Sequence, residues 1–397
     1  MRENIRVKKI NDILKQQKNR KGKFFLGSKI VALFIFCVPL CVARASEKSG
    51  KEYDYNIKDD GTIILKSYEG NQKNIIIPEN IDGMLVSELD GTFFGTDVTT
   101  VKIPETIDMI APGTFDNFCM QKIDVDINNQ NFCSVEGVLF DKDIKTLCAY
   151  PCANGNSSYN VPEGVEIIEM FAFDWAEELT NILLPDSLKI VQEDAFRFTG
   201  INEIKFPENI EKIGAGCVAG CENLEKIDIA CENRNYIEIE GVLFDKNMGT
   251  LVAYPKGKKN EEYIVPDGVK RIEKAAFFGC DNLKEIILPE TLEVLGPQAF
   301  CRCIRLTEIQ IPYNVKQLPE SVFASCSSLK NIYLPYGVEE IEDYSLYCEN
   351  VKEITLPETV AFISDYAFYD NVELMVRENS YAYTWAKNHG MKYRCIE

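Results

Sequence analysis

The side chains that could carry chemistry in this chain are cysteines, carboxylates and one histidine. Thirteen of the 15 cysteines follow residue 45, and two pairs, Cys217-x-x-x-Cys221 and Cys301-x-Cys303, have the close spacing of thiolate ligands for a metal ion. The only histidine, His389, lies near the C-terminus. A serine or cysteine triad therefore has no base, and zinc sites built on histidine pairs are excluded. Carboxylates are plentiful, so a hydrolase that acts on glycans through two of them stays open.

The elements that must position these side chains follow a repeat. An apolar-x-apolar-Pro motif ends at Pro78, Pro104, Pro162, Pro185, Pro207, Pro266, Pro289, Pro312, Pro335 and Pro357. Within each cluster the prolines are 22 to 26 residues apart, and apolar residues recur three places after them and, from Pro104 onward, six and eleven places after them. A unit of this length buries its apolar face only against its neighbours. The sequence therefore predicts a solenoid.

The two long gaps between prolines contain matching insertions. Glu136-Gly-Val-Leu-Phe-Asp-Lys in the first gap recurs at Glu240 in the second, and Tyr150-Pro151 recurs as Tyr254-Pro255, so a module of about 104 residues is duplicated. Each insertion also holds a strand without the proline, at 122–125 and 226–229. Adding these two to the ten proline units predicts about twelve coils.

The cysteines and phenylalanines fall in register with this repeat. The residues eleven places after the prolines, from Pro104 onward, are Phe115, Phe173, Phe196, Val218, Phe277, Phe300, Phe323, Leu346 and Phe368. Three places after them lie Cys221, Cys280, Cys303 and Cys326, and Cys348 takes this role in a shortened unit. We interpret both sets as core ladders, with cysteine as a small hydrophobe, in preference to a metal site, a disulfide or a cofactor channel. Among the remaining cysteines, Cys148 and Cys152 are the most plausible disulfide pair.

The unit Leu283-Lys-Glu-Ile-Ile-Leu-Pro-Glu-Thr-Leu-Glu-Val-Leu-Gly-Pro-Gln-Ala-Phe300-Cys-Arg-Cys303 resembles the BspA-type leucine-rich repeat. The resemblance covers residues 53 to 397, and Val218 and Leu346 depart from it where phenylalanine is usual. It implies a β-rich solenoid that winds as a right-handed coil. It also implies a secreted or cell-surface protein that adheres to other proteins, with no cofactor and no catalysis.

Both ends of the solenoid are predicted to carry caps. Two apolar segments, 53–57 and 62–65, flank Asp59-Asp60-Gly61 and indicate a hairpin. A short helix from Ser380 to Asn388, stopped by Gly390 and followed by a strand through Tyr393, closes the other end. The predicted organisation is a signal peptide at 1–45, a cap hairpin at 46–75, the solenoid at 76–372 and a C-terminal cap at 373–397.

The N-terminal segment is typical of an export signal. Ten basic residues fall within the first 29, and an apolar run of 14 residues, 30–43, follows them. This run is shorter than the ~20 residues that span a bilayer, and Ala43-Arg44-Ala45 is a small-x-small cleavage pattern. We expect cleavage after Ala45 and a secreted or cell-surface location. The alternative is that the segment is not cleaved and anchors the protein, in which case it would be the only part in contact with the membrane.

The negative net charge of the chain limits the kinds of molecule that it is expected to bind. The first 45 residues hold 11 of the 43 basic and 2 of the 62 acidic residues, so removing them changes the formal charge from −19 to −28. Such a chain repels nucleic acid and anionic membranes and attracts basic proteins or cations. No nucleic-acid partner is expected.

Two surface rows are candidate binding sites. The residue after each proline is acidic except at Tyr313 and Tyr336. The need for a polar turn residue after the strand is the preferred explanation of this row, and a surface that binds cations or basic proteins is the alternative. The second row comprises the solvent-facing strand positions Lys102, Asp124, Asn160, Leu183, Lys205, Asp228, Ile264, Ile287, Gln310, Tyr333 and Thr355. Its later part is apolar and aromatic, as at many interfaces, although β-propensity alone also accounts for it.

The predicted ligand-binding residues are Ile264, Ile287, Gln310, Tyr313, Tyr333 and Tyr336. We expect a protein or glycan ligand from a host or a neighbouring cell. The alternatives are a carboxylate hydrolase acting on glycans and a calcium-binding envelope protein.

Overall fold

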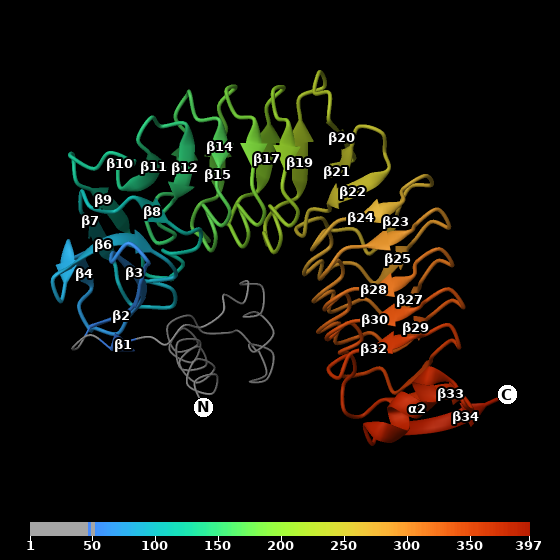
Figure 1. Cartoon of the computed structure of the whole chain (residues 1–397). Helices are drawn as coiled ribbons and strands as arrows, with labels where there is room; N and C mark the ends of the chain where they lie inside the picture. Colours follow the sequence, from blue (N-terminus) through green and yellow to red (C-terminus); the bar gives the residue numbers. More distant parts are fainter. Residues whose placement is uncertain (1–46, 49–51) are drawn as a thin grey trace.

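The computed structural model describes residues 47–48 and 52–397. The chain forms a β-solenoid of about 15 turns that curves into an arch, with the first turns in one limb and the last turns in the other (Figure 1). The predicted leader, including Ala43 and Ala45, lies outside the described residues. Within the described part of the chain, no helix has the length and apolar character needed to span a bilayer.

Two parallel ladders of short strands run along the solenoid. The first contains the strands before the prolines, in which the central side chain is buried and its neighbours are exposed. Its members are β4 (Asn74–Ile76), β7 (Thr100–Ile103), β9 (Lys122–Val125), β13 (Ser158–Asn160), β15 (Asn181–Leu183), β17 (Glu203–Phe206), β19 (Lys226–Ile229), β23 (Glu262–Ile264), β25 (Glu285–Ile287), β27 (Glu308–Gln310), β29 (Asn331–Tyr333) and β31 (Glu353–Thr355).

The second ladder contains the apolar residues six places after the prolines, which are the inward-facing ends of two-residue strands, together with one four-residue strand from each insertion. It contains β8 (Met109–Ile110), β12 (Thr146–Ala149), β14 (Ile167–Ile168), β16 (Ile190–Val191), β18 (Lys212–Ile213), β22 (Thr250–Ala253), β24 (Arg271–Ile272), β26 (Val294–Leu295), β28 (Gln317–Leu318), β30 (Glu340–Ile341) and β32 (Phe362–Ile363). A turn segment then returns the chain to the next strand of the first ladder.

Aromatic rings stack along the core at the position eleven places after the prolines. Phe277, Phe300 and Phe323 are fully buried, and their ring centroids are 5.3 and 5.5 Å apart. Tyr150 and Tyr254 continue the stacks in the inserted coils, each 5.1 Å from the next phenylalanine. Offset stacking and burial of these rings stabilise the interfaces between the coils that carry them.

The turn segments use left-handed backbone at recurring positions. Nine places after the prolines, φ is positive at Gly113, Phe171, Asp194, Gly216, Ala275, Gln298, Ser321 and Tyr344. The turn fixes this conformation, whichever residue is present. Only glycine adopts it without steric cost, so each bulky residue here carries strain that the surrounding packing must hold.

Each insertion is an antiparallel hairpin with a strand buried on both faces. In the first, β10 (Phe132–Val135) pairs with β11 (Val138–Asp141), which pairs with β12; in the second, β20 (Tyr236–Ile239), β21 (Val242–Asp245) and β22 repeat the arrangement. Leu139 packs with the core cluster before it, whereas Val138 and Phe140 pack with the next one. The inserted strands therefore divide the core into three segments, and they lie at the two corners of the arch (Figure 1).

The caps take the predicted form. β2 (Tyr53–Ile57) and β3 (Ile63–Tyr68) form the N-terminal hairpin, with β1 (Glu47–Lys48), β5 (Asn80–Ile81) and β6 (Met84–Leu89) in the same sheet. At the other end, β33 (Glu373–Arg377) and β34 (Lys392–Ile396) flank helix α2 (Tyr381–Asn388), whose N-cap Ser380 accepts a hydrogen bond from the Tyr383 amide. Because β33 and β34 extend the first ladder in parallel, the turn count exceeds the twelve expected from the prolines and insertions.

Candidate functional site

The predicted strand-face residues lie together on the last limb of the solenoid. Ile264 is the register partner of Ile287, and Gln310 is the register partner of Tyr333. The exposed fractions of Ile264, Ile287 and Tyr333 are 60%, 41% and 53%, and Gln310 is exposed as well. Strand alternation produces this row, because Ile286, Ile309 and Ile332 between the exposed positions point into the core.

Tyr313 and Tyr336 extend this surface from the strand ends into the turns after the prolines. Their exposed fractions are 58% and 60%. The turns fit closely, since a Cβ atom on Gly337 would lie 2.3 Å from the Tyr313 carbonyl oxygen. The Lys316 ammonium lies 5.5 Å from the centre of the Tyr313 ring, in cation–π range. We call Ile264, Ile287, Gln310, Tyr313, Tyr333 and Tyr336 the strand-face patch.

The same row is less apolar in the earlier limb. Leu183 is 56% exposed, but its register partner on one side is Asn160, and Lys205 pairs with Asp228 farther along. Ile76 is 76% exposed and its register partner is Lys102. Along this row of the described strands, exposed apolar side chains are thus isolated in the first half and adjacent in the second.

A column of carboxylates beside the patch was missed by the sequence reasoning. Glu262, Glu285, Glu308 and Glu353 occupy the exposed first position of their strands, and Glu262 is the register partner of Glu285. The detectable pattern was a glutamate two residues before four of the five solvent-facing strand residues of the last limb, the exception being Asn331 before Tyr333. Like charges at adjacent register positions repel each other, so a cationic partner would relieve this column.

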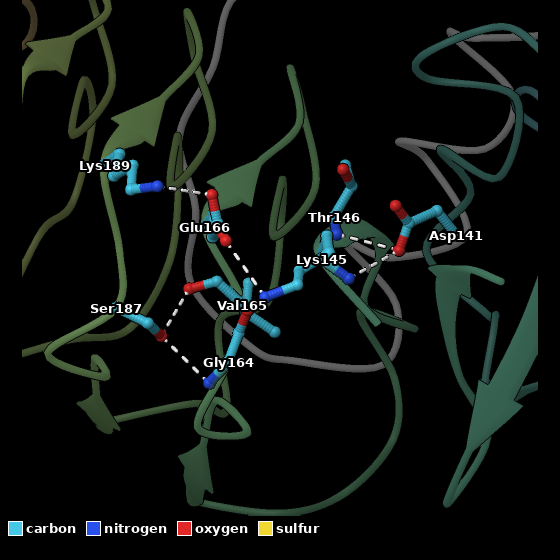
Figure 2. A network of polar contacts seen from close by, with 8 residues as sticks. All are labelled: Asp141, Lys145, Thr146, Gly164, Val165, Glu166, Ser187 and Lys189. Carbon is cyan, nitrogen blue, oxygen red and sulfur yellow. Dashed lines mark hydrogen bonds and ion pairs between the residues drawn. The ribbon is translucent and has the colours of Figure 1, made fainter. Parts of the chain in front are cut away.

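Ion pairs tie neighbouring coils together elsewhere on the surface. Figure 2 shows Glu166 between two lysines, with its carboxylate oxygens 3.0 Å from Lys145 Nζ and 2.6 Å from Lys189 Nζ. Hydrogen bonds from Lys189 and then Lys145 lower the pKa of Glu166 to about 2. In the same view, the Ser187 hydroxyl accepts from the Gly164 amide and donates to the Val165 carbonyl. These contacts join coils and leave no open ligand site.

The ladder cysteines are buried and hydrogen bonded. The thiols of Cys221, Cys303, Cys326 and Cys348 donate to the carbonyl oxygen of a repeat phenylalanine in an earlier coil, at 3.0 to 3.1 Å. Burial raises the pKa of the Cys221 thiol to about 11 and that of Cys303 further. A buried thiol that stays protonated is neither a nucleophile nor a metal ligand, so the core interpretation is confirmed.

The suggested bridge between Cys148 and Cys152 is absent. Both thiols are free, and the Cys152 thiol lies 2.9 Å from the Asn117 carbonyl oxygen in the preceding coil. Among the described residues, no group of three or more histidine, cysteine, aspartate or glutamate side chains is arranged to hold a metal ion. His389 stacks on Trp385, and its ring nitrogens contact the Trp385 carbonyl oxygen and Asp365.

A shallow hollow of ≈ 340 Å³ lies between coils of the middle segment. Its lining includes Glu203 and Glu225, both exposed, beside Asn181, Asn202 and Lys226. A glycosidase keeps its acid in apolar surroundings that exclude water. The hollow provides no such setting, so the structure offers no observation in favour of the hydrolase alternative.

A buried ionic network at the bends was also invisible in the sequence. Arg197 holds Asp174 through two hydrogen bonds of 3.0 and 2.6 Å, and the Asp174 side chain is fully buried. Lys274 Nζ lies 2.7 Å from Asp194 Oδ2, although 80 residues separate them. This ion pair spans the two coils that lie between Asp194 and Lys274. The turns that carry these two residues therefore lie on the inside of the second bend.

Small residues permit this close approach. A Cβ atom on Gly216 would lie 2.5 Å from Asp194 Oδ1, and one on Gly220 would lie 2.4 Å from the Phe198 ring. The glycine-rich segment 214–220, which superficially resembles a dinucleotide loop, therefore allows neighbouring coils to approach closely at the bend. Trp175 stacks on Phe198 at 4.2 Å, and Phe198 meets Phe278 edge to face at 5.8 Å, so aromatic contacts accompany the ion pairs.

Comparison with known proteins fits this geometry. Residues 67–142, 142–252 and 252–375 match the family described as BspA type Leucine rich repeat region, in six copies. The chain belongs to the BspA-type leucine-rich repeat family. Among curated proteins, none matches this BspA-type chain.

Two solved structures share the fold of this BspA-type chain. A leucine rich cell surface protein from Faecalibacterium prausnitzii is 24% identical, with a TM-score of 0.57, and the match covers 89% of this chain and 100% of the other. The pneumococcal vaccine antigen PcpA is 17% identical, with a TM-score of 0.53, and the match covers 89% and 99% of the two chains. At these identities the likeness shows the fold alone.

Proposed function

We propose that this protein is exported and binds another protein through the strand-face patch of its last coils. The observation that carries the proposal is the patch itself, where Ile264, Ile287, Tyr313, Tyr333 and Tyr336 are each 41% to 60% exposed on successive coils. Interfaces are enriched in tyrosine and apolar side chains. Family membership and the cell-surface description of the Faecalibacterium relative support a surface location and an adhesive role.

The shape of the molecule suits binding better than catalysis. A solenoid offers an extended face on rigid strands, where a row of side chains keeps its spacing without any lid or loop movement. The patch contains one glutamine, two isoleucines and three tyrosines, and it has no carboxylate, histidine, serine or cysteine side chain. An export signal in the first 45 residues accounts for the basic N-terminal segment and leaves a strongly acidic mature chain.

The test uses the chain from Ser46 onward and a panel of extracellular proteins and glycans. We expect a bound protein whose affinity falls at least tenfold when Ile287, Tyr333 and Tyr336 are replaced by serine. The matched control replaces Ile76 and Leu183, which are 76% and 56% exposed at the same strand position in earlier coils. The control should bind like the unaltered chain, and both variants should keep the same circular dichroism.

Two results contradict the proposal. Equal loss of binding in the patch and control variants would mean that the patch is not the contact surface. Cleavage of a glycan that is abolished by one carboxylate substitution, such as Glu203→Gln, would replace the binding function with the hydrolase.

The location of the protein is tested separately. We expect to recover a chain that begins at Ser46 from the culture medium or the cell surface.

A further inference from the structure

Four tyrosines form a continuous aromatic surface on the turn segments of the last two proline units. The rings of Tyr344 and Tyr366 stack with centroids 5.8 Å apart and an interplanar angle of 21°. Tyr347 meets Tyr344 edge to face at 5.7 Å and Tyr369 at 4.9 Å. Tyr366 is 60% exposed, and the other three are half-buried. We call these four residues the tyrosine cluster.

The repeat itself does not call for large rings at these positions. Nine places after the proline, the three preceding coils hold Ala275, Gln298 and Ser321, and twelve places after it they hold Phe278, Cys301 and Ala324. Ala275, Phe278, Cys301 and Ala324 belong to a small buried cluster of their own. Tyr344 also has a φ of 57°, a conformation that bulky side chains rarely adopt. The turn accommodates residues from alanine to phenylalanine at these positions, so its packing does not require four tyrosines.

Carboxylates adjoin the tyrosine cluster in the chain. Asp343, Asp365 and Asp370 are exposed. The side chain of Asp365 is 73% exposed, although it also contacts His389. Asp370 lies close enough to Tyr347 that its charge helps to raise the pKa of that phenol, after burial and the neighbouring Tyr369. Aromatic faces bordered by carboxylates attract cations, and the guanidinium group both stacks on rings and hydrogen bonds to carboxylates.

The same limb already shows this chemistry within the chain. Lys316 lies 5.5 Å from the centre of the Tyr313 ring, and Lys387 lies 6.0 Å from that of Tyr383. In the middle segment, Arg197 lies 5.0 Å from the Phe171 ring while it pairs with Asp174. Cations thus lie over aromatic rings at several places in this fold, and in the tyrosine cluster Tyr366 and the neighbouring aspartates are exposed to solvent.

We propose that the tyrosine cluster is a second interaction surface, separate from the strand-face patch, that takes arginine side chains of a basic protein segment. Charge complementarity selects this occupant, because the three aspartates and the overall acidity of the chain favour a cationic partner. The exposed tyrosine faces select arginine over lysine. The surface acts without the strand-face patch, so a partner can bind either surface alone.

The experiment compares two labelled peptides of equal charge, nona-arginine and nona-lysine, by fluorescence polarisation at physiological ionic strength. General attraction to an acidic chain affects both peptides alike, so the ratio of their affinities isolates the aromatic contribution. We expect nona-arginine to bind roughly fivefold tighter, and the ratio to fall to about one in Tyr344→Ser/Tyr366→Ser. Phe94→Ser is the matched control, since Phe94 is an aromatic residue that is 53% exposed and lies outside both surfaces.

A second variant keeps the test valid if loss of two rings disturbs the turn. Asp370→Asn removes a charge without removing packing, and it should weaken nona-arginine binding about twofold to threefold. A ratio of one in the unaltered chain, or the same ratio in the cluster variant and the control, would overturn the proposal. Binding of neutral oligosaccharides that depends on Tyr366, with no preference for arginine, would overturn it in favour of a sugar site.

Discussion

Replacement of Arg197 by methionine tests whether the buried ionic network holds the middle segment at its bends. The substitution keeps an unbranched side chain against Phe171 and Phe198 but removes both hydrogen bonds to Asp174, whose side chain is fully buried. At about 3 Å and an effective dielectric constant near 20, the lost attraction is roughly 5 kcal/mol. Removing one partner of a buried pair typically costs 3–5 kcal/mol, and we expect a loss in that range.

The loss should depend on pH. Burial raises the pKa of Asp174 from 3.8 to about 6, and Arg197 opposes that rise. Because the folded-state pKa lies above the unfolded one, the folded state binds more protons between about pH 4 and 6, and Asp174 lowers stability as pH rises through that window. Without Arg197 the pKa of Asp174 rises further. The variant should therefore lose more stability at pH 8 than at pH 5, where the acid is protonated.

The assay is equilibrium urea unfolding with a local reporter. Trp175 stacks on Phe198, next to Arg197, whereas the other described tryptophan, Trp385, lies in the C-terminal cap. In a Trp385→Phe background, fluorescence reports the middle segment alone. Asp174→Asn/Arg197→Met removes both charges and should recover at least half of the lost stability. A loss under about 1 kcal/mol, equal losses at both pH values, or no recovery in the double variant would refute the reasoning.

Three further predictions address the core, the bend and the cysteines. Phe300→Ala removes two ring stacks from a fully buried position and should cost about 3–5 kcal/mol in urea unfolding, whereas Phe300→Leu should cost markedly less; equal costs would show that ring stacking is not what joins the coils. Gly220→Ala should destabilise by roughly 2 kcal/mol or more, because its Cβ would lie 2.4 Å from the Phe198 ring and φ is +73°; Gly61→Ala, with φ +82° and open space around it, should show only the conformational cost of about 1 kcal/mol. Iodoacetamide should label Cys231 and Cys395 first in the folded chain, and Cys221, Cys303, Cys326 and Cys348 only after denaturation, as counted by mass spectrometry; rapid labelling of the ladder thiols would contradict their burial.

Much of the fold follows from local regularity that the sequence displays. Apolar residues three, six and eleven places after the prolines fix the inward face of each coil, because no other arrangement buries them all. The cysteine ladder was predicted from the same register, and the cap hairpin and the final helix were predicted from local turn and capping residues. The strand-face patch was predicted because alternation along a strand fixes which side chain faces solvent.

The tertiary structure decided what depends on contacts between distant coils. The sequence contained two copies of the insertion, but only packing shows that Leu139 faces one core segment while Val138 and Phe140 face the next. The pairing of Lys274 with Asp194 across 80 residues needs the bend, and the bend needs the glycines at 216 and 220. The tyrosine cluster likewise needs the register of two coils to bring Tyr344 and Tyr366 face to face. Periodicity determines what each coil buries against its neighbours, whereas curvature brings together coils that are not adjacent.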